Sequence, residues 1–261
     1  EGIGLAHGVE ARPGAISGFS LTPRGLVTLR LPDAAAREPK TGGASASRPV
    51  SSLAAAVPPS PAITPVTATA SAATSAFPPG ITGTGYLSLL HILLSSGAMD
   101  RQGHFTPDGC GPLKRFFTPT KETASGGVQG EEHLALPLSL RLTATDVEEI
   151  LKVKAAFSLG LHRLLQTAGL ASRDLARVYV AGALGEHVNK RALEELGFFP
   201  QGMENRLEAV GNTSLAGAVL LMRRPDLRPA LVQWAAKVKT LDLASDPAFT
   251  KHFAEHMRFV W

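Results

Sequence analysis

A buried strand that runs straight into glycines is the part of this sequence best suited to bind a ligand. Residues 178–182 read Val-Tyr-Val-Ala-Gly, and a second glycine follows three positions later. A strand that ends in glycine lets a ligand approach the backbone, because no Cβ stands in the way. In open α/β sheets, ligands lie outside the carboxyl ends of such strands. Gly182, Ala183, Leu184 and Gly185 are therefore the first candidates for contact with a nucleotide base or ribose.

Two further glycine turns precede expected helices. Gly83, Thr84 and Gly85 lead into an apolar helix, and Gly211 and Asn212 stand between a short strand and a helix rich in Ala and Leu. The free N–H groups of a first helical turn attract an anion such as phosphate, which makes both turns candidates as well. The same residues also fit an ordinary turn, with Asn212 as a plain N-cap beside a tight helix contact.

No self-contained catalytic set accompanies these turns, so the sequence leaves the catalytic residues unknown. His252 and His256 are four residues apart, but Glu255 is not placed as in a zinc-protease motif, and we expect no metal ligands. The single cysteine, Cys110, excludes an internal disulfide and any cluster held by several thiolates of this chain. A lone thiol fits a reducing cytoplasm, where we expect the protein to reside.

The composition indicates a globular protein without nucleic-acid or membrane partners. Of 261 residues, 44% are hydrophobic, and no apolar run reaches the ~18 residues needed to span a bilayer. The formal net charge is +4. Five basic residues cluster among apolar ones without stacking aromatics, which favours a solvated helix face over a nucleic-acid site. They are Arg223, Arg224, Arg228, Lys237 and Lys239. Since Glu1 is not Met, we expect a cut or processed start.

The chain divides into two structured parts around a segment of low complexity. Residues 32–79 consist almost wholly of Ala, Ser, Thr, Pro and Gly, and cannot bury enough apolar surface to offset the cost of ordering them. We expect a disordered insertion at 32–79 within one domain formed by residues 1–31 and 80–261. In the first part, two strands near 15–19 and 26–31 are expected, with a turn at 22–25.

Hydrophobic periodicity predicts the elements of the second part. Helices are expected at 86–96, 190–196, 213–222, 229–237 and 247–257, and strands at 134–142, 178–182, 207–210 and 241–243. Residues 107–131 are expected to form a loop. A long helix should begin at a capping box, Thr145 to Glu148, and run to Gly169. Strand and helix alternate from residue 140 onward, which is typical of the α/β class.

Six segments in this order resemble the C-terminal domain of the reductive activators of corrinoid proteins. The match spans nearly the whole chain except residues 33–79 and parts of 107–133. The segments are residues 1–16, 80–90, 96–105, 142–165, 178–200 and 210–218, and the tail at 241–259 is similar as well.

The resemblance implies part of an actin-like ATPase fold, of the ribonuclease H-like type. It also implies that ATP, with Mg²⁺, drives reduction of an inactive Co(II) corrinoid on a partner protein to Co(I). Residues 182–185 then fall on the adenosine loop and 83–85 on the loop facing the nucleotide, with Gly211 and Asn212 supporting the same cleft. A [2Fe–2S] cluster is expected only in an upstream domain. The partner is a corrinoid protein, and a homodimer is left open.

Departures from the family pattern keep alternatives open. Gly is usual in the family where this chain has Ala183, and an aromatic residue where it has Leu184. The Asp-Ile-Gly-Thr-Asn motif that should hold phosphate and Mg²⁺ is absent, so we expect this chain to be inactive alone and to act within a longer protein. One alternative is a degenerate, non-catalytic module that docks a corrinoid protein. Another is an activator of a 2-hydroxyacyl-CoA dehydratase, which the lack of a cysteine pair disfavours.

Overall fold

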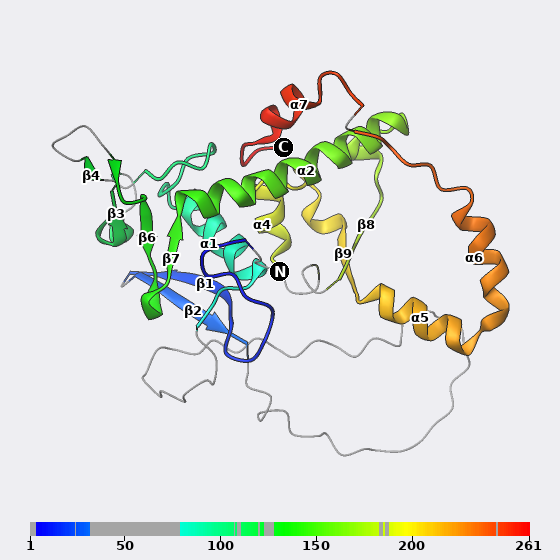
Figure 1. Ribbon diagram of the computed structural model, residues 1–261, viewed down its shortest axis with the longest axis horizontal. Coiled ribbons are helices and arrows are strands. Elements are labelled where there is room, and N and C mark those ends of the chain that lie inside the picture. Colours follow the sequence, from blue (N-terminus) through cyan, green and yellow to red (C-terminus); the bar gives the residue numbers. More distant parts are fainter. Residues whose placement is uncertain are drawn as a thin grey trace, which may run out of the picture.

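The computed structural model describes residues 4–23, 25–31, 79–106, 108, 111–119, 121–122, 128–182, 185, 188–243 and 245–261. The predicted insertion at 32–79 therefore lies almost wholly outside the described residues. Helix α2 runs diagonally across the molecule, with α7 on one side of it and α1 and α4 on the other (Figure 1). The principal helices are α1 (Gly83–Ser95), α2 (Ala144–Thr167), α4 (Lys190–Glu195), α5 (Thr213–Arg223), α6 (Arg228–Ala235) and α7 (Phe249–His256).

The two predicted N-terminal strands are confirmed as an antiparallel hairpin. Strand β1 (Ile16–Thr22) pairs with β2 (Gly25–Arg30), and α1 packs on the hairpin. The chain on either side of residues 32–78 meets beside β1. Leu31 donates its N–H to Ala15 O at 2.9 Å, and Ile16 donates its own to Gly80 O at 2.9 Å. A further backbone bond runs from Val9 N to Ile81 O at 3.0 Å.

The single strand predicted at 134–142 is wrong, because the chain reverses in its middle. Strand β6 (His133–Ala135) pairs antiparallel with β7 (Arg141–Thr143), and the turn η4 (Pro137–Ser139) joins them. Leu138 and Ser139 adopt positive φ angles of 65° and 59° in this turn, so no extended strand can pass through it.

The segment predicted as a loop at 107–131 contains short elements. They are η3 (Gly111–Phe116), β3 (Phe117–Thr118), β4 (Lys121–Glu122) and β5 (Val128–Gln129). Strand β3 pairs with β6 and β4 pairs with β5, both antiparallel. Cys110 lies outside the described residues.

Helix α2 begins two residues earlier than its predicted capping box. Thr143 Oγ1 accepts the N–H of Asp146 at 3.0 Å, and the Asp146 carboxylate accepts the N–H of Thr143 at 3.0 Å. The other Asp146 oxygen accepts the N–H of Ala6 at 2.7 Å, a contact across 140 residues. Asp146 is 2% exposed, so this distant partner fixes whether Thr143 or Thr145 caps the helix. The buried face of α2 carries Val147, Ile150, Leu151, Ala155 and Leu159.

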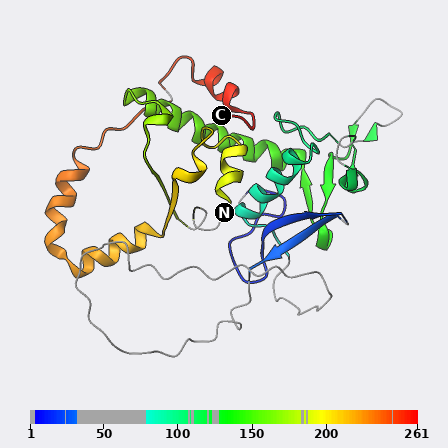
Figure 2. The ribbon, with the colours of Figure 1, turned by 180° about the vertical axis from the view of Figure 1, so that it is seen from behind.

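The second half of the chain contains a small parallel sheet. Strand β8 (Val178–Ala181) pairs with β9 (Leu207–Gly211), and α4 lies between them in sequence. After β9, helices α5 and α6 form an arm that reaches away from the rest of the molecule in both ribbon views (Figure 1, Figure 2). The strand predicted at 241–243 is wrong, since these residues are irregular in the structure. The elements η5 (Ser172–Asp174), η6 (Glu204–Arg206) and η7 (Pro225–Leu227) complete the chain.

One continuous hydrophobic core lies under α1 and α2. It joins Ile16 and Phe19 of the hairpin to Leu89, Leu90 and Leu93 of α1, all 5% exposed or less. It continues through α4 to Leu207, the first residue of β9. The core therefore holds the base of β9, while at the far end of the pair Ala181 of β8 is exposed and Gly211 of β9 is buried.

Candidate nucleotide-binding turns

The two parallel strands end at the same edge in glycines that contact each other. Ala181 is paired with Gly211, and Gly182 donates its N–H to Gly211 O at 2.8 Å. Gly182 has φ +94° and Gly211 φ +67°, a left-handed region that favours glycine. Among the described residues, a Cβ built on Gly182 meets no atom within 4 Å, so the described part of the fold leaves the space before this turn open. Two of the three predicted turns thus form one structural unit.

Gly185 has a different reason for being glycine. It is buried, and a Cβ there would lie 2.5 Å from Val180 Cγ1 and 2.9 Å from Val180 O. Gly185 therefore lies directly against Val180 of β8, with no room for a side chain. Ala183 and Leu184, between the two glycines, lie outside the described residues.

The start of α5 is open to solvent. Asn212 accepts the N–H of Leu215 on its side-chain oxygen at 3.0 Å, which confirms the predicted N-cap. Asn212, Thr213 and Ser214 are all exposed. Because Asn212 directly follows Gly211, the N-terminus of this 11-residue helix stands beside the Gly182 turn. The exposed first turn of α5 and the positive end of its dipole therefore lie at the same edge as the two glycines.

The turn at residues 83–85 is built into the packing instead. Thr82 Oγ1 donates to Ile16 O at 3.1 Å and accepts the N–H of Gly85 at 3.2 Å. Thr84 Oγ1 lies 2.8 Å from Thr82 Oγ1, and both threonines are buried. A Cβ on Gly85 would lie 2.6 Å from Ile16 O, so glycine lets α1 sit directly on β1. Gly83 is half-buried above this contact. That all three turns meet on one ligand stays a prediction.

Helix α4 connects the two glycine regions. From α1, His91 Nε2 lies 2.8 Å from Glu195 Oε2, and Arg191 donates Nε–H to Glu195 Oε1 at 2.6 Å. The Arg191 hydrogen bond, together with His91, lowers the pKa of the Glu195 carboxyl below its usual range. Because α4 lies between β8 and β9 in sequence, this polar link joins α1 to the segment that connects the parallel pair.

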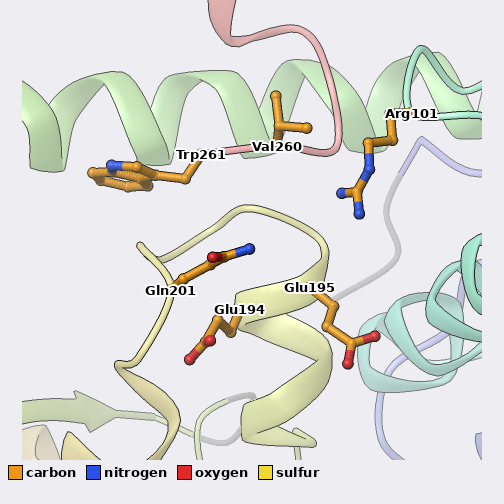
Figure 3. A pocket seen from close by; sticks show the side chains of 6 residues that line it. All are labelled: Arg101, Glu194, Glu195, Gln201, Val260 and Trp261. Carbon is orange, nitrogen blue, oxygen red and sulfur yellow. The ribbon is translucent and has the colours of Figure 1, made fainter.

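A cavity of about 420 Å³, which no sequence motif indicated, lies beside α4. Figure 3 shows Arg101, Val260 and Trp261 on one side of it, and Gln201 with the two α4 carboxylates on the other. Arg101 donates to Phe259 O at 2.8 Å, and Glu194 accepts the N–H groups of Gly202 and Glu204, both at 2.8 Å. The first bond holds the C-terminal segment to Arg101, and the other two hold the loop after α4 to the helix. The cavity depends on contacts between distant segments, so local sequence carried no signal for it.

His252 and His256, the two histidines four residues apart, have polar partners within the fold. His256 Nδ1 lies 2.8 Å from Ser158 Oγ, and burial lowers the pKa of its ring. His252 lies 3.3 Å from an Asp246 oxygen. Within the described ranges, no three His, Cys, Asp or Glu side chains are grouped to hold a metal ion. Among the helices of the described residues, none is long and apolar enough to cross a bilayer.

Comparison with known proteins shows which family the chain matches. Residues 1–261 match the family described as the C-terminal domain of RACo, the ASKHA domain. The corrinoid activation enzyme RamQ of Eubacterium limosum is 22% identical over 194 residues, which are 70% of this chain and 31% of RamQ. A solved structure of a reductive activator for corrinoid, iron-sulfur protein superposes with a TM-score of 0.67 at 23% identity, covering 99% of this chain and 34% of that one.

The fold is thus of the actin-like ATPase (ASKHA) class, as the sequence predicted, a class that in general binds nucleotide with Mg²⁺. Within that class, the chain belongs to the family of the C-terminal domain of RACo. It spans about a third of the length of the relatives it matches.

Proposed function

We propose that this chain is the C-terminal, ATP-binding portion of a cytoplasmic reductive activator that returns a Co(II) corrinoid on a partner protein to Co(I). The observation that carries the proposal is the Gly182–Gly211 junction beside the open start of α5, in a chain that matches the activator family over its whole length. The similarity to RamQ supports the corrinoid part of the proposal.

The residues at this edge fit a nucleotide. Gly182 offers backbone with no Cβ and open space before it, and Asn212 begins a helix whose first-turn N–H groups are exposed. Gly182, Gly211 and Asn212 would hold the nucleotide, with residues 183–185 completing the loop. The glycines at 83–85 would approach from α1, through Gly83. We propose that the [2Fe–2S] cluster is held by another part of the intact protein, since this chain has a single cysteine. Mg²⁺ ligands are proposed to come from there as well, since the Asp-Ile-Gly-Thr-Asn motif is absent from this chain.

ATP would supply the free energy for an uphill electron transfer. Raising one electron by ~0.25 V costs roughly 6 kcal/mol. Nucleotide binding can contribute this only if it favours a conformation of the complex in which the corrinoid is easier to reduce. The part of this chain in that change is to bind and orient the nucleotide and to transmit its presence through α4 and α5.

Titration of the intact protein with labelled ATP tests the proposal. Gly182→Asp should weaken ATP binding at least about tenfold, because it adds a side chain and a negative charge at the open turn. Gly202→Asp is the matched control: Gly202 also has a positive φ, of 83°, and no atom within 4 Å of a built Cβ. Equal ATP affinity in wild type and Gly182→Asp would overturn the assignment of this edge.

The competing function is a docking module that binds no ATP. Its support is that the Thr82 and Thr84 hydroxyls and the Gly85 N–H already have partners within the fold, which leaves fewer donors for phosphate. If the intact protein binds a corrinoid protein but no ATP, this function is favoured over the activator.

A further inference from the structure

Residues 246–261, which we call the clasp, are held on helix α2 by contacts between described residues of this chain. Helix α7, the first part of the clasp, packs against α2 and lies along it in both ribbon views (Figure 1, Figure 2). Beyond α7, Phe259 is fully buried in the core and donates its N–H to Arg101 O at 2.7 Å. A Cβ on Gly197, just after α4, would overlap the backbone of Val260. The clasp therefore packs on both α2 and the end of α4.

The interface between the clasp and α2 brings a buried ammonium group next to an imidazole. Lys154 of α2 is fully buried, and its Nζ donates to Val260 O and to His256 O, the latter at 3.2 Å. One turn further along α2, Ser158 Oγ lies 2.8 Å from Nδ1 of His256. After another turn, the ring centroid of His162 lies 5.9 Å from that of His256. The His256 ring is thus surrounded by side chains of α2 that carry or can gain positive charge.

The groups that influence the charge of His256 are mostly basic. They are Lys154 and His162 from α2, His252 and Glu255 from α7, and Arg258, which lies near Lys154, from the segment after α7. Glu255 is 51% exposed and pairs with Lys251 at 4.0 Å, so water screens its carboxylate. Burial lowers the pKa of the His256 ring, and Lys154 lowers it further. The closed clasp therefore favours a neutral His256.

The other histidine of α7 has a carboxylate to balance its charge. His252 Nδ1 lies 3.1 Å from a guanidinium nitrogen of Arg163 and 3.3 Å from an oxygen of Asp246. A proton on His252 loses the Arg163 hydrogen bond but gains an ion pair with Asp246. Among the described residues, none of the ion pairs involves His256. An added proton is therefore compensated at His252 and not at His256.

We propose that acid releases the clasp: a proton on His256 places a second positive charge beside buried Lys154, and the clasp then leaves α2. Lys154 has two carbonyl acceptors, and no carboxylate of the described residues pairs with it. Two neighbouring cations in a site shielded from water repel far more strongly than they do at the surface. The inference concerns contacts within this chain and does not depend on ATP binding.

The direction of the pH dependence follows from which state binds the proton. In the closed clasp the pKa of His256 is below the ordinary value of 6.5, to which exposure on release returns it. The released clasp then binds a proton that the closed clasp does not, so closure weakens as the pH falls below about 6.5. Lys154, whose pKa burial lowers to about 8, is charged throughout that range. At higher pH His256 is neutral in both states and the clasp stays closed.

Amide hydrogen exchange of the intact protein, read on peptides by mass spectrometry, tests the proposal. Between about pH 7.5 and about pH 5.5 an ordinary imidazole gains its proton, and protection of the α7 amides, corrected for the intrinsic exchange rate, should fall at least about fivefold. Amides of α1, whose helix carries seven buried residues, should keep their protection. Equal protection of α7 at the two pH values would overturn the proposal.

The variant His256→Asn removes the titrating ring and keeps a polar atom near the position of Nδ1, within reach of Ser158. The fall in α7 protection should then shrink to about twofold or less. His104→Asn is the matched control, because His104 is 3.2 Å from an Asp100 oxygen and lies outside the clasp; it should respond to acid as wild type does. A wild-type response in His256→Asn would assign the release to another group and overturn the proposal.

A second readout decides the matter if His256→Asn leaves α7 unprotected at both pH values. Hydrogen exchange at the imidazole C2 position, also read by mass spectrometry, gives the pKa of His256 in the intact protein. In wild type this pKa should lie below 6.5, and Lys154→Met should raise it because the neighbouring positive charge is removed. A wild-type pKa at or above 6.5, or one that Lys154→Met leaves unchanged, would overturn the proposal.

Discussion

The two glycine-rich regions look alike in sequence and differ in what their glycines do. At the start of α1, Gly85 is required by a contact with Ile16 O, and the neighbouring hydroxyls are bonded within the fold. At the end of β8, Gly182 is required by its positive φ, and it faces open space. The first region is packed and the second is open. Glycine therefore marks either a tight contact or an accessible backbone, and only the surroundings tell which.

The packed region should respond most strongly to added volume. Gly85→Ala places a Cβ 2.6 Å from backbone of β1, so either α1 or the hairpin must shift, and we expect a loss of about 3 kcal/mol in the free energy of unfolding. Chemical denaturation measures it. Gly160→Ala on α2, where a Cβ meets nothing within 4 Å, is the control and should stabilise by up to ~1 kcal/mol. Equal effects of the two substitutions would erase the distinction between packed and open glycines.

The contrast between packed and open parts of the fold also extends to a buried charge, the ammonium group of Lys154. Its burial should make the free energy of unfolding depend on pH. Lys154 is fully buried under the C-terminal segment, where Nζ donates to Val260 O and His256 O. Desolvation, with Arg258 nearby, lowers the pKa of Lys154 from 10.5 to about 8. Above pH 8 the folded protein loses this proton while the unfolded chain keeps it, so the free energy of unfolding should rise with pH up to roughly 10.5.

The rise should amount to about 1.5 kcal/mol between pH 8 and about pH 9.5. Lys154→Met removes the titrating group, and its stability should be flatter across that interval. Urea unfolding at several pH values gives the slope of the free energy of unfolding against pH for wild type and for Lys154→Met. A change in the absolute stability of the variant does not affect this slope. A wild-type slope that Lys154→Met leaves intact would show that another group is responsible.

Two helix caps with the same hydrogen-bond length compare a packed site with an open one. The difference in stability expected between them is the smallest of these predictions. Thr143 and Asn212 each accept a backbone N–H at 3.0 Å, but Thr143 is 5% exposed and Asn212 is open to solvent. Alanine at 143 leaves a buried N–H without a partner and should cost about 1 kcal/mol, whereas water replaces the lost partner at 212 and the cost should be about half. Thermal unfolding of both variants measures the difference. The reverse order would mean that burial does not govern these caps.

Features encoded over short distances were predictable from sequence. The 3.6-residue periodicity located α1, α2, α5 and α7, and the hairpin turn between β1 and β2 was recognisable from its proline and glycine. The α/β class and the Asn212 cap followed from the same local signals.

Features decided by distant partners were not. The choice of Thr143 over Thr145 as the cap depends on the bond between Asp146 and Ala6. The reversal places Leu138 and Ser139 at positive φ, which these residue types rarely adopt, so Pro137 and Ser139 were too weak a turn signal to reveal it. At the candidate site, the Gly-ended strands could be predicted, whereas the contact that explains Gly85 could not, because it joins residues far apart in sequence.

The backbone bonds beside β1 have a consequence for engineering and for evolution. Ala15 and Ile16 are neighbours in the chain, and they hold Leu31 and Gly80 respectively. The polypeptide between those two residues therefore leaves and re-enters the fold at adjacent points. Each doubling of such an excursion adds only ~0.6 kcal/mol of closure entropy. Its length can consequently drift among homologues, or a reporter domain can be spliced into it, without disturbing the packing of α1 on the hairpin.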